Sequence, residues 1–160
     1  MRNISSRYFD YGESTAREKY GDVRFLADLP DSDWARLAKY SEARRYSPGS
    51  ALMEAGAGDQ SLYLLTKGLV GVVLPGQKSP FKEIDAPSVL GEVSFIDGGP
   101  RSLSLVALSE CEALRLSMEA FEVLAAHEPE LGRRVLIAIA RVLAMRLRSA
   151  TELINQSGSA

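Results

Sequence analysis

The stretch of sequence that decides the fold is Leu90–Val106, which reads LGEVSFIDGGPRSLSLV. A Gly-Glu pair opens a short apolar segment, a Gly-Gly-Pro turn follows, and Arg-Ser then leads into a strand-like run. One carboxylate, Glu92, and one cation, Arg101, therefore lie on either side of a turn. A carboxylate accepts a hydrogen bond from a sugar hydroxyl, whereas a guanidinium offers a planar fork of donors to phosphate oxygens. The pair suits a ligand that carries both groups.

Short strand-like runs surround this stretch on both sides. Turn signals such as Pro48-Gly49, Lys67-Gly68 and Pro75-Gly76 separate the runs. Many short strands at close spacing are typical of an antiparallel barrel or jelly roll. The expected strands are Arg44–Tyr46, Ala51–Glu54, Ser61–Thr66, Leu69–Leu74, Phe81–Ile84, Ser88–Leu90, Leu103–Leu108 and Cys111–Leu116.

Helical patterns flank the strand-rich region. Asp31 or Ser32 is expected to cap one helix, and Ser117 is a good N-cap for another. Pro129 suits the first turn of a longer helix, where its missing N–H is not needed. The expected helices are Val23–Leu29, Asp33–Tyr40, Met118–Ala126 and Glu130–Ile154. The sequence thus predicts an α+β fold, an antiparallel jelly-roll β-barrel flanked by short N-terminal helices and a long C-terminal helix.

The length of 160 residues is enough for one domain with its own core. The first twenty residues are polar and unpatterned, so we expect a flexible arm over residues 1–20. The domain is expected over residues 21–154 and a flexible tail over residues 155–160.

The last helix carries more apolar surface than a single contact face needs. Its two apolar stripes are Leu131, Val135, Ala138, Val142 and Met145, and Leu136, Ile139, Leu143, Leu147 and Ile154. We expect the first stripe to pack on the barrel and the second to pair with its own copy in a homodimer. The alternative is that the N-terminal helices cover the second stripe within one chain.

Composition argues against several classes of function. The net charge of −2 weighs against a broad nucleic-acid surface, and the sequence leaves no room for a helix-turn-helix after the last helix. No apolar leader opens the chain, and the run Val135–Ala140 is too short to cross a bilayer. We therefore expect a cytoplasmic protein that binds neither nucleic acid nor membranes.

The sequence has few residues of the types that usually catalyse reactions or bind metals. His127 is the single histidine, and Cys111, the single cysteine, lies in an apolar strand pattern typical of a core position. No nucleophile–base pair stands out, and no cluster has metal-ligand spacing. We expect a binding protein without a metal rather than an enzyme.

Taken together, these segments resemble the cyclic nucleotide-binding domain family, in the form found in catabolite activator-like sensors but without a DNA-binding domain. The likeness covers residues 25–147. The segments that carry it are Phe25–Leu29, Tyr46–Gly49, the glycine-rich turn to Asp59, Leu62–Gly68, Gly91–Val106, Pro129–Leu131 and Arg146-Leu147.

The resemblance implies a role for each site residue. Glu92 matches the carboxylate that accepts from the ribose hydroxyl, and Arg101 matches the arginine that pairs with the cyclic phosphate. Arg146 lies where the family's last helix often covers the base. The remaining positions line the pocket or bring backbone close to the ligand: Leu90, Gly91, Val93, Ser102 and Leu103.

The family resemblance implies a stand-alone sensor that binds cAMP, or cGMP, and signals through its last helix to a separate effector protein. One departure is Leu103, which stands where the family usually has alanine. A domain whose pocket has degenerated, serving as a dimerisation or docking module, is therefore the alternative. Binding of cyclic di-GMP is a third hypothesis.

Overall fold

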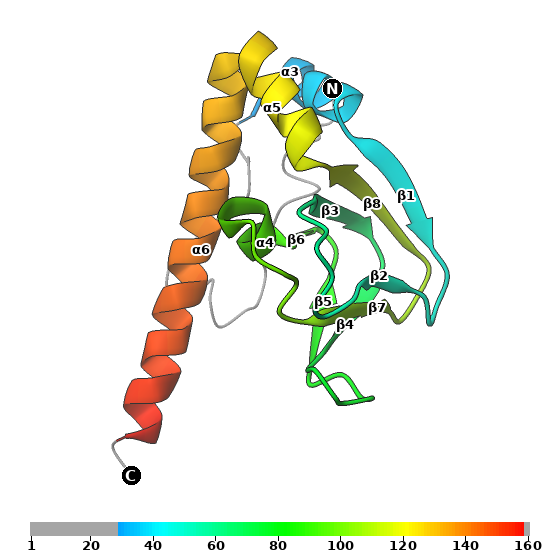
Figure 1. The fold of residues 1–160 in the computed structure, drawn as a ribbon, viewed down its shortest axis with the longest axis vertical. Helices are drawn as coiled ribbons and strands as arrows, with labels where there is room; N and C mark the ends of the chain where they lie inside the picture. The colour runs from blue at the N-terminus through cyan, green and yellow to red at the C-terminus, as the bar shows by residue number, and fades with distance from the viewer. Residues whose placement is uncertain (1–28, 159–160) are drawn as a thin grey trace.

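Eight short strands form two four-stranded antiparallel sheets in the computed structural model, which describes residues 29–158 (Figure 1). The strand order is β1-β8-β3-β6 in one sheet and β2-β7-β4-β5 in the other. All the predicted strands are present, which confirms the jelly-roll prediction. Their bounds are β1 Glu42–Tyr46, β2 Ala51–Met53, β3 Leu62–Lys67, β4 Leu69–Val73, β5 Lys82–Asp85, β6 Ser88–Leu90, β7 Ser104–Ala107 and β8 Cys111–Leu116.

Helices lie before, within and after the strands. They are α3 Asp31–Lys39, α4 Glu92–Asp97, α5 Met118–His127 and α6 Pro129–Ser157. The Ser117 side chain accepts from the Ala120 N–H, so the predicted cap of α5 is confirmed. The predicted cap of α3 is wrong, because the helix begins at Asp31 after Pro30 and has no side-chain cap. Asp31 and Asp33 instead lie in its first turn, where the helix dipole favours carboxylates.

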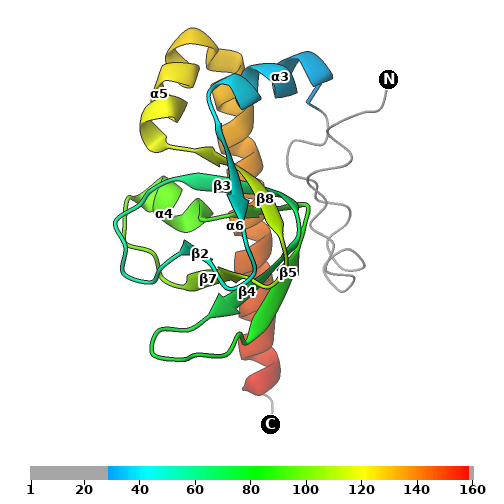
Figure 2. The same ribbon diagram turned by 90° about the vertical axis from the view of Figure 1, so that its right-hand side faces the viewer.

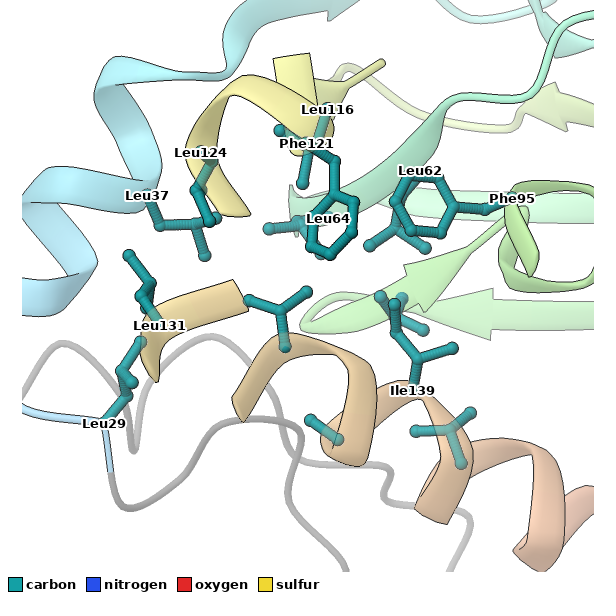
Figure 3. Packing of buried hydrophobic residues seen from close by; sticks show 14 of the residues in the cluster. Leu29, Leu37, Leu62, Leu64, Phe95, Leu116, Phe121, Leu124, Leu131 and Ile139 are labelled. Carbon is teal, nitrogen blue, oxygen red and sulfur yellow. The ribbon is translucent and has the colours of Figure 1, made fainter. Parts of the chain in front are cut away.

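Strand β3 contributes side chains to both hydrophobic clusters and so joins the helices to the two sheets. Leu62 and Leu64 face the helices, whereas Tyr63 and Leu65 face the second sheet. Successive strand residues point to opposite faces, so a strand covered on both sides has no polar face. Figure 3 shows Leu62 and Leu64 packed with Phe95 of α4 and Phe121 of α5, whose rings meet edge to face at 5.4 Å.

Helix α6 runs along the whole height of the molecule and contacts both α4 and α5 (Figures 1 and 2). Leu131, Val135, Ala138 and Val142 are buried, as the first apolar stripe predicts. Ile139, assigned to the dimer stripe, is fully buried in the core, and that assignment is wrong. The arc of α6 buried in its own chain is wider than one stripe, because two helices as well as a sheet pack against it.

Predictions for the two ends of the chain have different outcomes. The predicted arm and most of the predicted helix Val23–Leu29 lie outside the described residues. Helix α6 extends to Ser157, so residues 155–157 are helical where a flexible tail was predicted. No helix among residues 29–158 is long and apolar enough to cross a membrane.

Candidate ligand-binding site

A cavity of about 120 Å³ lies where β6, α4, the loop after α4 and α6 meet. All the residues predicted from the sequence line it, although they come from three separate parts of the chain. They are Leu90, Gly91, Glu92, Val93, Arg101, Ser102, Leu103 and Arg146. The structure thus brings the predicted set together, while the role of each residue toward a ligand stays a prediction.

Gly91 joins β6 to α4 and approaches the arginine closely. Its φ is +77°, in the left-handed region that favours glycine. A Cβ at this position would lie 2.6 Å from Nη1 of Arg101 and 2.9 Å from the carbonyl oxygen of Ser61. Glycine is therefore required at position 91, because any side chain would push Arg101 out of place.

Arg101 is buried, with only 4% of its surface exposed, and most of its donors are occupied. Nη1 donates to the Gly91 carbonyl at 2.9 Å, and Nη2 donates to Asp59 Oδ2 at 3.0 Å and to the Ser61 carbonyl. No acceptor among the described residues reaches Nε, although this atom is buried. A buried N–H without an acceptor is costly, so the guanidinium is prepared for a further acceptor.

Asp59 anchors the guanidinium and was not predicted as a site residue. Its carboxylate accepts from Arg101, from Arg115 at 3.3 Å and from the Tyr63 hydroxyl at 3.2 Å. Burial raises the pKa of Asp59, but hydrogen bonds from Ser61 and Arg101 outweigh it and hold the pKa well below its ordinary value. The sequence signal was the glycine-rich turn that ends at Asp59.

The same turn also fixes the backbone of the arginine loop. The Arg101 N–H donates to the Ala57 carbonyl at 2.9 Å, and the Gly56 N–H donates to the Arg101 carbonyl at 2.7 Å. Arg101 also lies over the Tyr63 ring, 5.9 Å from its centroid. The backbone and the side chain of Arg101 are therefore both held in place. This preorganisation lowers the entropic cost of ordering the guanidinium when a ligand binds.

Glu92, the first residue of α4, is 4% exposed and faces α6. Nη1 of Arg146 donates to Glu92 Oε1, and Nη2 of Arg146 donates to the Val89 carbonyl at 3.2 Å. The predicted hydroxyl acceptor is thus engaged by the residue predicted to cover the base. Arg146 links the middle of α6 to both α4 and β6.

The other predicted residues differ in how they face the cavity. Val93 and Ser102 are exposed, and Leu103 is half-buried against the core between the two sheets. The wall also contains apolar residues that were not predicted from the sequence: Met53, Val72, Ile84 and Leu105. These residues lie on strands of the second sheet, and nothing local in their sequence marks them as pocket residues rather than core.

The described residues include no cluster of three or more His, Cys, Asp or Glu side chains that could hold a metal ion. The chemistry of the cavity is that of recognition. Two guanidinium groups, one buried carboxylate and two serine side chains lie in an otherwise apolar wall. Such a site orients a ligand through few polar contacts and binds the rest by apolar contact.

Comparison with known proteins agrees with this chemistry. Residues 43–128 match the family model of the cyclic nucleotide-binding domain. The chain is similar to the cAMP-dependent protein kinase regulatory subunit of Aspergillus fumigatus, with 28% identity over 113 residues, 71% of this chain and 27% of that protein. It thus spans about a quarter of the length of this curated relative.

Two solved structures share the fold at similar identity. A cyclic nucleotide-binding domain from Methylobacillus flagellatus has a TM-score of 0.73 and 29% identity, covering 81% of this chain and 74% of its own. The catabolite activator protein of Thermus thermophilus has a TM-score of 0.73 and 28% identity, covering 84% of this chain and 62% of its own.

Proposed function

The chain belongs to the cyclic nucleotide-binding domain family, and from this premise we propose that it is a sensor whose cavity binds cAMP. The cyclic phosphate pairs with Arg101 and the ribose hydroxyl donates to Glu92. The observation that carries the proposal is the buried Nε of Arg101, which has no acceptor among residues 29–158 and belongs to a residue of the cavity wall. A phosphate oxygen supplies that acceptor, and a charge-assisted hydrogen bond is about twice as strong as a neutral one.

The remaining wall residues fit a nucleoside. Backbone at Gly91 and the exposed Ser102 approach the phosphate side, while Leu90, Val93 and Leu103 offer apolar contact. The curated relative named as a cAMP-dependent kinase subunit favours cAMP over cGMP as the ligand. The family model describes a binding domain, in line with a regulatory rather than catalytic role.

Ligand binding must change the position of Arg146. A cavity of about 120 Å³ is smaller than the roughly 300 Å³ at which small-molecule sites begin. Arg146 also holds the carboxylate that the ribose needs. The nucleotide therefore competes with Arg146 for Glu92 and favours a conformation in which α6 is released from α4 and β6. This is a population shift, limited by the difference in affinity between the two conformations.

We propose that the signal leaves through α6 to an effector protein, and that α6 also forms a homodimer. A seam of apolar residues follows α6 at alternate steps of four and three residues: Leu136, Ala140, Leu143, Leu147, Ala150 and Ile154. This 3.5-residue repeat is the pattern of a coiled coil. Leu136, Leu147 and Ile154 are 42%, 68% and 71% exposed, so the seam is open to a second copy.

One observation favours a second candidate function. The small cavity and the half-buried Leu103 also fit a domain that has lost its ligand and acts as a dimerisation or docking module. Calorimetric titration with cAMP, cGMP and cyclic di-GMP separates the candidates. We expect cAMP to bind at one site per chain. Tighter binding of cyclic di-GMP would replace cAMP as the ligand, and heat from none of the three would favour the docking module.

A further inference from the structure

Helix α5 borders the N-terminal end of the apolar seam on α6. The two helices pack closely at Gly132, where an added Cβ would lie 3.0 Å from both the Cα and the Cβ of Ala125. Leu136, the first residue of the seam, follows Gly132 by four residues and therefore lies on the same side of α6. Figures 1 and 2 both show α5 beside the N-terminal part of α6. A second copy seated on the seam therefore also approaches α5.

The exposed face of α5 is acidic. Phe121 and Leu124 are buried in the core, whereas Glu119, Glu122 and Ala126 are exposed. These three exposed residues are spaced by three and four positions, so they share one face of the helix. Neither carboxylate forms an ion pair with another residue of the described range 29–158. Two like charges one turn apart repel each other, so this face favours a partner that carries a cation.

Helix geometry indicates which residue of a second copy reaches this face. The two helices run in opposite directions, and Ala125 is level with Gly132 (Figure 1). Glu122 precedes Ala125 by three residues, so it lies close to the level of Val135. In a parallel pair of α6 helices, residues of the same number are level with each other. Val135 is buried, whereas Arg133, roughly 3 Å away along the helix axis, is exposed.

Arg133 also continues the seam by one heptad, because it precedes Ala140 by seven residues. In a parallel pair it would face its own counterpart, and two facing cations repel each other. Glu130 forms ion pairs with Arg133 at 2.5 Å and with Arg134 at 3.4 Å, so one carboxylate serves two cations of its own helix. The N-terminal end of the seam therefore needs a further anion when two copies meet.

We propose that the second copy on the seam also binds the acidic face of α5, with Arg133 of each copy paired to Glu122 of the other. This inference rests on the proposed homodimer and gives it a parallel orientation. In an antiparallel pair of α6 helices, Arg133 would lie at the opposite end of the seam from Glu122. Two-fold symmetry makes two such pairs in each dimer, and flanking charge pairs of this kind set the orientation and the partner of a coiled coil.

Charge reversal tests the two pairs, since Glu122 and Arg133 are both exposed in the single chain. Sedimentation equilibrium gives the dimer dissociation constants of wild type, Glu122→Arg and Arg133→Glu, and circular dichroism checks that each is folded. Each substitution turns two attractive contacts into repulsive ones, so each variant should self-associate at least roughly tenfold more weakly. The controls Glu110→Arg and Lys78→Glu make the same reversals in exposed turns between strands and should match wild type.

An equimolar mixture of Glu122→Arg and Arg133→Glu separates a contact between copies from an effect within one chain. In the mixed dimer the introduced arginine faces the introduced glutamate, and the remaining Glu122 faces the remaining Arg133. We expect the mixture to regain the wild-type dissociation constant. Single variants that associate like the turn controls, or a mixture no tighter than its components, would overturn the inference and leave the homodimer standing. A wild type that stays monomeric at tens of micromolar would refute the homodimer and the α5 contact together.

Discussion

Removing the Arg146 side chain should strengthen nucleotide binding. The guanidinium occupies Glu92, so Arg146→Ala frees the carboxylate for the ribose hydroxyl. A hydrogen bond to a charged group is worth about 1.5–3 kcal/mol, but the Arg146 side chain is 38% exposed and screening reduces this to about 1 kcal/mol. A closed form favoured by that amount outnumbers the open form about fivefold. The apparent affinity for cAMP should therefore rise about fivefold in the variant.

The assay is calorimetric titration of cAMP into wild type and Arg146→Ala, with Arg148→Ala as the matched control. Arg148 is exposed on the same helix and carries the same charge, so its loss measures the long-range effect of removing a cation near an anionic ligand. Hydrogen exchange of the amides around Arg146 gives a second readout. It should increase in Arg146→Ala without ligand and in wild type with cAMP.

The opposite result would refute the competition between Arg146 and the ribose. Binding weaker in Arg146→Ala than in Arg148→Ala means that Arg146 contacts the nucleotide, as the family resemblance predicts for a base cover. Absence of binding to every variant, with all proteins folded by circular dichroism, would instead refute the proposed ligand. The two failures are therefore distinguishable.

Four further predictions follow from the same contacts. Arg101→Ala should lower cAMP affinity by at least about thirtyfold, the low end of 2–5 kcal/mol, and should also lower the urea midpoint because the carbonyls of Gly91 and Ser61 lose their donor. Glu92→Gln should abolish any preference for cAMP over its 2′-deoxy form, measured by titrating both ligands. Leu147→Glu should yield folded monomers by sedimentation, since this seam residue is 68% exposed. Asp59 has a lowered pKa when folded, so the stability that it contributes should be lost as pH falls below about 4, and Asp59→Asn should flatten that part of the acid-unfolding curve.

The strand segments and the residues that line the cavity followed from local sequence signals. Turn residues and alternating apolar residues are local features, so all the strands of residues 29–158 were predictable within a few residues. The stretch Leu90–Val106 was equally informative, because Gly91 has a conformation and a close contact that only glycine accepts. Where the backbone itself requires the residue type, sequence predicts structure well.

The face of a helix is harder to predict when several elements cover it. Ile139 and Leu147 have the same chemistry in the sequence, yet Ile139 is fully buried and Leu147 is 68% exposed. The difference depends on where α4 and α5 meet α6, which periodicity alone does not encode. The structural role of Arg101 is likewise not visible in its turn sequence, since its side chain donates to the carbonyls of Gly91 and Ser61.

The sequence could not predict ion pairs between residues that are far apart in the chain. Arg101 binds Asp59 and Arg146 binds Glu92, partners separated by 42 and 54 residues. Each arginine could pair with any of many carboxylates in the chain, and only tertiary packing determines which one it contacts. Sequence therefore predicts which residues line the cavity, whereas the proposed state of the cavity depends on one contact between α6 and α4. If that contact is worth about 1 kcal/mol, as its partial exposure indicates, small changes on α6 are enough to set the affinity of the site. The proposed dimer seam on the same helix would then give assembly and ligand binding a shared element through which each can influence the other.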